Sequence, residues 1–170
     1  MIYTSSYDNY KDGEYEKYSI SGDRGKKANY EGKCYPKLAP KKEFWTVWHN
    51  NIGKISEEEN LKYYIREYYI EVLSELDPEE VYKELDNSVL LCYEDIDEFC
   101  HRDIVSAWLE LFLVGVKVDE IKNGKTFERP NHQKIKYYLE KVIKSSINME
   151  EHNDLRSLYL TQKNKKKYIK

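Results

Sequence analysis

The chain has 170 residues, which is enough for one domain with its own hydrophobic core. Hydrophobic residues make up 40% of it and charged residues 35%, a composition typical of globular proteins and unlike that of disordered or fibrous chains. The net charge of −3 argues against a protein whose whole surface binds polyanions.

The first half of the chain combines short strand patterns with loops. Residues 2–4 and 16–20 are rich in β-formers and predict two strands. The run Gly22-Asp23-Arg24-Gly25 predicts a tight polar turn. Its glycines would let the backbone approach a ligand closely, and an ordinary surface turn explains them equally well. Residues 26–40 predict a long loop, and a helix over 44–48 follows it.

The middle of the chain carries the clearest helix signals. Ser56 and Glu59 form a capping box, and apolar residues then keep helical spacing over 61–76. Asp77-Pro78 ends that helix and begins a shorter one. This second helix leads into the apolar run 88–92, which predicts a buried strand.

The second half predicts two further helices, a strand and a basic end. Helical spacing continues from Cys100 to Phe112, with Gly115 as the expected C-cap, and residues 116–121 alternate like a strand. A helix is expected over 131–145 and a weaker one over 149–159. Five lysines crowd into 163–170, a basic tail that suits either contact with nucleic acid or a plain solvated terminus.

Nothing in the chain predicts export or membrane insertion. The start soon turns polar, and the apolar run 109–118 is too short to span a bilayer. Three cysteines without a secretory signal favour reduced thiols. We therefore expect a cytoplasmic protein that does not enter a membrane, and the oligomeric state stays open.

These elements predict a single α/β domain over residues 1–162. We expect three layers: a small, mainly parallel, Rossmann-like sheet with helices on both faces. Such sheets bind ligands at the carboxyl ends of their strands. Ser5, Ser6 and Cys92 lie at such ends, and Arg24 lies in the turn after another, so we expect these four residues to bind a ligand.

The predicted helix start after the 88–92 strand carries chemically versatile residues. Cys100 would have a lowered pKa beside Arg102 and a helix N-terminus, and Arg102 suits a phosphate or a carboxylate. His101 and Glu94 could exchange protons near neutral pH. Glu94, Cys100 and His101 are therefore the candidate catalytic residues, and Arg102 the candidate anion-binding residue.

Two known templates fit this region poorly. Cysteine phosphatases place five residues between cysteine and arginine, whereas nine separate Cys92 from Arg102 and one separates Cys100 from it. Cys92, Cys100, His101 and Cys34 are residue types that bind zinc. However, no Cys-x-x-Cys or His-x-x-x-His pair supports such a site. We therefore expect no metal ion and no cofactor.

Leu-Leu-Cys-Tyr-Glu (90–94) followed by Phe-Cys-His-Arg-Asp-Ile-Val (99–105) resembles the signature of a bacterial and phage family known as domain of unknown function 488. That signature is a strand ending in Cys-x-Glu, a variable loop, and Cys-His-Arg opening a helix. Residues 2–7, 19–21 and 38–40 also resemble the family, so the likeness covers about 1–121. It implies a compact α/β domain with a site at the Cys-x-Glu and Cys-His-Arg residues, and it implies no known reaction.

Two classes of function remain open. The first is an enzyme acting on a nucleotide, a nucleic-acid base or another phosphorylated small molecule. The second is a non-catalytic module that binds an anion or a nucleotide. An open pocket containing Glu94 and Arg102 would favour the enzyme, whereas a buried network with every polar group bonded inward would favour the binding module.

Overall fold

The computed structural model describes residues 1–148, which form a single α/β domain around a six-stranded sheet. The strand order is β3-β2-β4-β1-β5-β6, and only the β5–β6 pair is antiparallel. The strands are β1 (Ile2–Ser6), β2 (Glu16–Ser19), β3 (Lys33–Cys34), β4 (Ser88–Cys92), β5 (Glu120–Lys122) and β6 (Lys125–Phe127). The predicted α/β class and mainly parallel sheet are confirmed.

The central strands β1 and β4 set the position of the polar residues. They pair in parallel from Ile2 opposite Ser88 to Ser6 opposite Cys92, and β2 pairs with the other edge of β4. All five residues of β4 are buried, which explains its nearly continuous apolar sequence. The carboxyl ends of β1, β2 and β4 therefore meet at one edge of the sheet.

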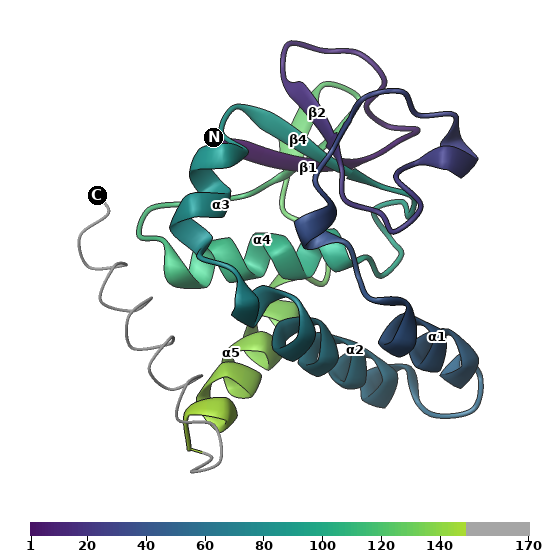
Figure 1. Cartoon of the computed structure of the whole chain (residues 1–170), viewed down its shortest axis with the longest axis vertical. Coiled ribbons are helices and arrows are strands. Elements are labelled where there is room, and N and C mark those ends of the chain that lie inside the picture. The colour runs from purple at the N-terminus through teal and green to yellow at the C-terminus, as the bar shows by residue number, and fades with distance from the viewer. Residues whose placement is uncertain (149–170) are drawn as a thin grey trace.

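Five helices stack in two tiers on one side of this sheet (Figure 1). The helices are α1 (Lys42–Asn51), α2 (Glu57–Glu71), α3 (Pro78–Glu84), α4 (His101–Phe112) and α5 (His132–Asn148). Helix α4 contacts β1 and β4 directly, and α5 packs against both α4 and α2. Every helix contributes to one apolar core, in which Trp108 is fully buried.

The opposite face of the sheet carries tyrosines instead of helices. Val89, Leu91 and Ile121 form a second apolar cluster there, covered by side chains from strands and loops that include Tyr7, Tyr10, Tyr15, Tyr30 and Tyr93. Many of the 17 tyrosines in the chain thus cover this face. The α-helices expected on both faces, as in a Rossmann-like sheet, are therefore not found among residues 1–148, because the segments 7–15 and 20–32, whose one helical turn is the 3-10 helix Lys26–Ala28, cover this face.

The N-caps that the sequence predicted at Ser56 and Asp77 are confirmed. The Ser56 hydroxyl accepts a hydrogen bond from the Glu59 backbone N–H at 3.1 Å, and the Asp77 carboxylate accepts one from Glu79 N–H at 2.9 Å. The predicted strand over 116–121 is wrong in its extent, since only its end belongs to β5. The backbone N–H of Val118 donates its hydrogen bond to the Glu110 carboxylate and not to a neighbouring strand.

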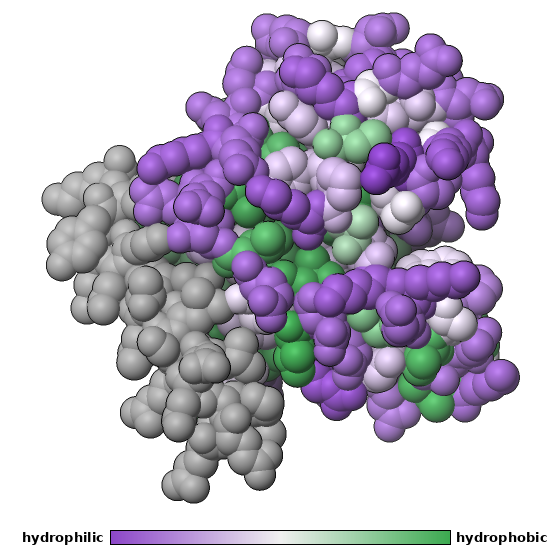
Figure 2. All heavy atoms as spheres, in the orientation of Figure 1, coloured by the Kyte–Doolittle hydropathy of each residue, from purple (hydrophilic) through white to green (hydrophobic). Residues whose placement is uncertain are grey.

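The surface in Figure 2 is mostly hydrophilic over the sheet, and hydrophobic side chains gather between the sheet and the helices below. Among residues 1–148, no helix combines the length and the hydropathy needed to cross a membrane. The expected end of the domain at 162, the helix over 149–159 and the basic tail lie outside the described residues.

Candidate functional site

A cavity of about 570 Å³ opens beside the carboxyl end of β4. Loops, the end of β4 and residues of α1, α2 and α4 line it, since it lies between the sheet and the α1–α2 pair. Cys92, Glu94, Cys100 and His101 lie together in its lining and offer groups that can take part in chemistry. Four of the predicted site residues are thus brought together at one cavity.

Cys92 and Glu94 reach this cavity from the end of β4. Cys92 is the last residue of the strand, is 4% exposed, and donates its thiol hydrogen to the Glu94 carboxylate at 3.3 Å. Glu94 is two residues further on and is partly exposed. The parallel sheet therefore presents a thiol and a carboxylate side by side at the carboxyl ends of its strands, where sheets of this kind commonly bind ligands.

Cys100 and His101 approach the same point from the start of α4. Cys100 is the N-cap residue and His101 the first helical residue, and both are buried. The His101 Nδ1 atom lies 3.8 Å from the sulfur of Cys92 and 3.8 Å from that of Cys100. Its Nε2 atom lies 2.9 Å from the carbonyl oxygen of Ile20. Because a carbonyl only accepts, Nε2 carries the hydrogen, and Nδ1 faces the two sulfurs.

The four groups perturb one another strongly. Burial raises the pKa of the Glu94 carboxyl to about 7, and the charge of Cys100 adds to this effect. Burial alone would raise the pKa of Cys100, but the hydrogen bond with Cys92 and the positive charge of Arg102 lower it well below its usual value. The hydrogen bond with Cys100 and burial raise the pKa of Cys92. Of the two thiols, Cys100 is the one that ionises first.

Aromatic side chains form much of the remaining wall. Phe99 packs against both Trp48 and Tyr64, with ring centroids 5.6 Å and 4.9 Å away, and those two rings also contact each other. Trp45 is 40% exposed, and Tyr93 faces the cavity from the loop after β4. Sequence reasoning missed this wall, because Trp45 and Trp48 fit the apolar face of a helix equally well.

Charged groups lie around the opening. Lys27 and Lys42 line it and are exposed. Asp23 also lines it, and its carboxylate accepts hydrogen bonds from the Gly25 and Lys27 backbone N–H groups. Burial works against ionisation of Asp23, but the Tyr93 hydroxyl and these N–H groups lower its pKa to about 2. The opening thus combines two cations with one firmly ionised carboxylate.

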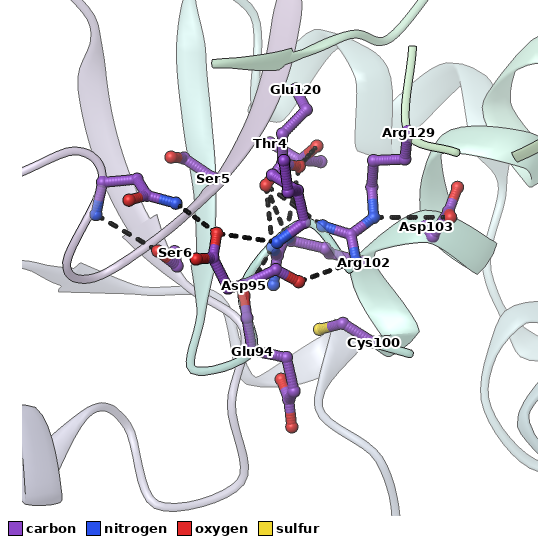
Figure 3. Close-up of polar contacts among 12 residues, drawn as sticks. Thr4, Ser5, Ser6, Glu94, Asp95, Cys100, Arg102, Asp103, Glu120 and Arg129 are labelled. Atoms are coloured by element: carbon purple, nitrogen blue, oxygen red, sulfur yellow. Dashed lines mark hydrogen bonds and ion pairs between the residues drawn. The ribbon is translucent and has the colours of Figure 1, made fainter. Parts of the chain in front are cut away.

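Arg102 points away from this cavity. Its side chain is fully buried, and its guanidinium binds the Glu120 carboxylate with an Nη2–Oε1 distance of 2.7 Å. It also donates to the backbone carbonyl of Glu94 at 2.7 Å. Figure 3 shows the Glu94 carboxylate directed away from Arg102 and Glu120. The expected Glu94–Arg102 carboxylate pair is therefore not formed, because Glu120 from β5 takes that place.

A buried charge network extends from this pair. Arg129 donates to Glu120 at 3.1 Å and lies 3.4 Å from the Asp103 carboxylate (Figure 3). Asp103 and Glu110 in turn bind the two ring nitrogens of His132, at 2.5 Å and 3.1 Å. Sequence reasoning missed this network, because its members lie far apart in the chain and look like ordinary surface charges.

The remaining predicted residues lie outside the cavity. Ser5 is buried and donates to the Ile121 carbonyl at 2.6 Å, and Ser6 accepts from the Asn9 backbone N–H at 3.1 Å. Arg24 is exposed and does not line the cavity. Gly25 has a φ of +79°, and a Cβ atom there would lie 2.7 Å from Tyr30, so this glycine serves packing rather than ligand approach.

Comparison with known proteins gives one match. A family model described as the active DUF488-N3 subclade (DUF488-N3a) matches residues 13–112, which include the Cys-x-Glu and Cys-His-Arg residues around the cavity. No curated protein and no solved structure matches the chain. The match covers more than half of the chain and agrees with the resemblance carried by the sequence motifs. The chain therefore belongs to the DUF488-N3a family within the domain of unknown function 488 group.

Proposed function

We propose that this cavity is the active site of an enzyme that acts on a nucleotide, a nucleobase or another phosphorylated small molecule. One observation carries the proposal: a carboxylate, an imidazole and two thiols gather at a cavity with aromatic walls and lysines at its opening. The word "active" in the description of the matching subclade agrees with an enzymatic role.

The lining suits a planar ring joined to an anion. Partly exposed aromatic side chains stack on nucleobases, with a contribution of about 1–3 kcal/mol per base. Trp45 is 40% exposed, although its ring already stacks on His49. Lys27 and Lys42 would attract a phosphate group at the opening. Glu94 would then transfer a proton to or from the bound ring, because its carboxyl lies beside the two thiols and its pKa of about 7 suits proton transfer near neutral pH.

A second function is favoured by a different observation. The hydrogen bonds of Arg102 go to Glu120 and to the Glu94 backbone, although its Nη1 atom has no hydrogen-bond partner, so the residue expected to hold an anion is used mainly for structure. A non-catalytic module that binds a nucleotide through Lys27, Lys42 and the tryptophans fits that arrangement. The open cavity contains Glu94 but not Arg102, so the pattern expected of an enzyme is met only in part; we prefer the enzyme because an imidazole and two thiols lie beside Glu94.

The first test is ligand binding followed by product analysis. Nucleotides, nucleosides and free bases are each added to the full chain, and thermal unfolding is recorded. A ligand at 100 times its dissociation constant adds about 2.7 kcal/mol of stability. Each stabilising ligand is then incubated with the protein and analysed by mass spectrometry. Unchanged unfolding with every nucleotide and base would contradict both functions.

The second test separates enzyme from binding module. Glu94→Gln keeps the shape of the side chain and removes its charge, so it should leave ligand binding within a few-fold and abolish product formation. Glu98→Gln is the matched control, since Glu98 lies in the same loop, is exposed and does not line this cavity. Stabilisation without any product from the wild-type protein would favour the binding module.

A further inference from the structure

Three buried side chains at the cavity present metal-binding atoms to one point. The sulfurs of Cys92 and Cys100 and the Nδ1 atom of His101 all lie within 4.8 Å of one another. We propose that these three residues bind a zinc ion, whose fourth position faces the cavity. The inference concerns the same cavity but stands on this geometry alone, whatever the substrate.

The separations match tetrahedral zinc. Zinc binds sulfur at about 2.3 Å and imidazole nitrogen at about 2.0–2.1 Å, so the tetrahedral angle places a sulfur and a nitrogen about 3.6 Å apart. The two observed sulfur–Nδ1 distances are both 3.8 Å. Both distances exceed the tetrahedral value by only about 0.2 Å, and all three atoms lie within 4.8 Å of one another, so small side-chain movements would bring them into coordination.

The imidazole has the orientation that a zinc ligand requires. Its Nε2–H donates to the Ile20 carbonyl at 2.9 Å, so Nδ1, which carries a lone pair when the ring is neutral, is directed at the two sulfurs. Metal-binding histidines usually donate their other ring N–H to a backbone carbonyl or a carboxylate in this manner. The Tyr68 ring and the imidazole also pack in an edge-to-face arrangement, with centroids 5.6 Å apart, which helps to fix the plane of the imidazole.

The three ligands come from rigid elements. Cys92 ends the fully buried strand β4, and Cys100 and His101 begin α4, which packs on that strand. Zinc sites with paired Cys-x-x-Cys motifs obtain such convergence from tight turns. Here β4 and α4 bring the three ligands together across the loop 93–99, so the ligands are not closely spaced in the sequence. For that reason the sequence spacing did not predict a metal.

The open fourth position decides the kind of zinc site. Structural zinc is closed by four protein ligands, whereas catalytic zinc keeps one position for water or substrate. Cys92, Cys100 and His101 all line the cavity, and the Glu94 carboxylate lies beside them, 3.3 Å from the Cys92 sulfur. The cluster therefore fits a catalytic site, in which zinc activates a bound water and Glu94 accepts its proton.

Cys34 belongs to neither the cluster nor the cavity. It ends the edge strand β3, and its sulfur lies 3.9 Å from the carbonyl oxygens of Arg24 and Gly32. Substitution of Cys34 therefore serves as a control, because it removes a thiol without changing the proposed zinc ligands.

The test measures zinc directly, without any substrate. The full chain is treated with a chelator, supplied with one equivalent of zinc, separated from free metal and analysed by mass spectrometry for metal content. Wild-type protein and Cys34→Ser should each retain about one zinc per chain, and Cys92→Ser and Cys100→Ser should lose it. Because buried substitutions can disturb folding, cobalt is added to the wild-type protein as well. Tetrahedral thiolate ligation then gives intense visible absorption and sulfur-to-cobalt charge-transfer bands.

Either of two results would overturn the proposal. One is wild-type protein that retains no zinc and gives only the weak spectrum of hydrated cobalt. The other is a disulfide between Cys92 and Cys100 in the protein purified without reductant, found by peptide mapping, since that bond removes both ligands. Failure of nucleotide binding would leave the zinc result untouched, so the two proposals fail independently.

Discussion

The substitution Glu120→Gln probes the buried charge network that holds β5 to α4. The Glu120 side chain is fully buried and accepts hydrogen bonds from three residues: Arg102, Arg129 and Thr4. A glutamine has the same shape but no charge, and its amide would direct N–H groups at two guanidinium cations. Arg102 would then lack any carboxylate partner among residues 1–148, while Arg129 would keep only Asp103.

The expected loss follows from the burial of both partners. Removing one member of a buried ion pair costs about 3–5 kcal/mol, because the remaining charge stays desolvated and unpaired. In a domain of this size each kcal/mol lowers the melting temperature by about 2–4 °C, so Glu120→Gln should lower it by about 6–20 °C. Urea unfolding followed by tryptophan fluorescence gives the free energy of unfolding directly.

Glu140→Gln provides the matched control. Glu140 pairs with Lys144 at 3.5 Å on the exposed side of α5, where an i,i+4 pair contributes only about 0.3–0.5 kcal/mol. Similar losses for the two glutamine variants, both below about 1 kcal/mol, would refute the reasoning that Glu120 neutralises a desolvated network.

Two further predictions concern the N-terminal ends of α5 and α2. Burial alone would lower the pKa of His132, but its hydrogen bonds with the Asp103 and Glu110 carboxylates raise it to about 9. The folded-state pKa exceeds the unfolded value, so the stabilisation is complete below about pH 6.5 and is lost as the pH rises through about 9. His132→Gln should flatten this alkaline decline in urea titrations at several pH values, and an unchanged profile would contradict the assignment. Ser56→Ala should cost about 1 kcal/mol, since it removes the N-cap hydrogen bond of α2, and a change near zero in the unfolding midpoint would show that this helix end frays.

The sequence alone determined the elements whose signals are local. The caps at Ser56 and Asp77 follow from backbone N–H groups that need a side-chain acceptor within the next turn. The apolar run of β4 requires burial on both faces, which places it at the centre of a parallel sheet. Cys92 ends that strand and Cys100 begins the next helix, so the sequence also predicted that these two residues lie close together.

Only the tertiary structure decided which partners these residues meet. Arg102 was expected at a ligand and instead binds Glu120, since a fully buried guanidinium is stable only beside a buried carboxylate, and β5 brings one there. The aromatic wall at Trp45 depends on how α1 and α2 dock, and the helices occupy one face because loop tyrosines cover the other. The cluster of His101 with the two sulfurs arises from a carbonyl far away in sequence, that of Ile20, which orients the ring. Such contacts join segments that no local pattern connects, and their energies depend on desolvation that exists only in the folded chain.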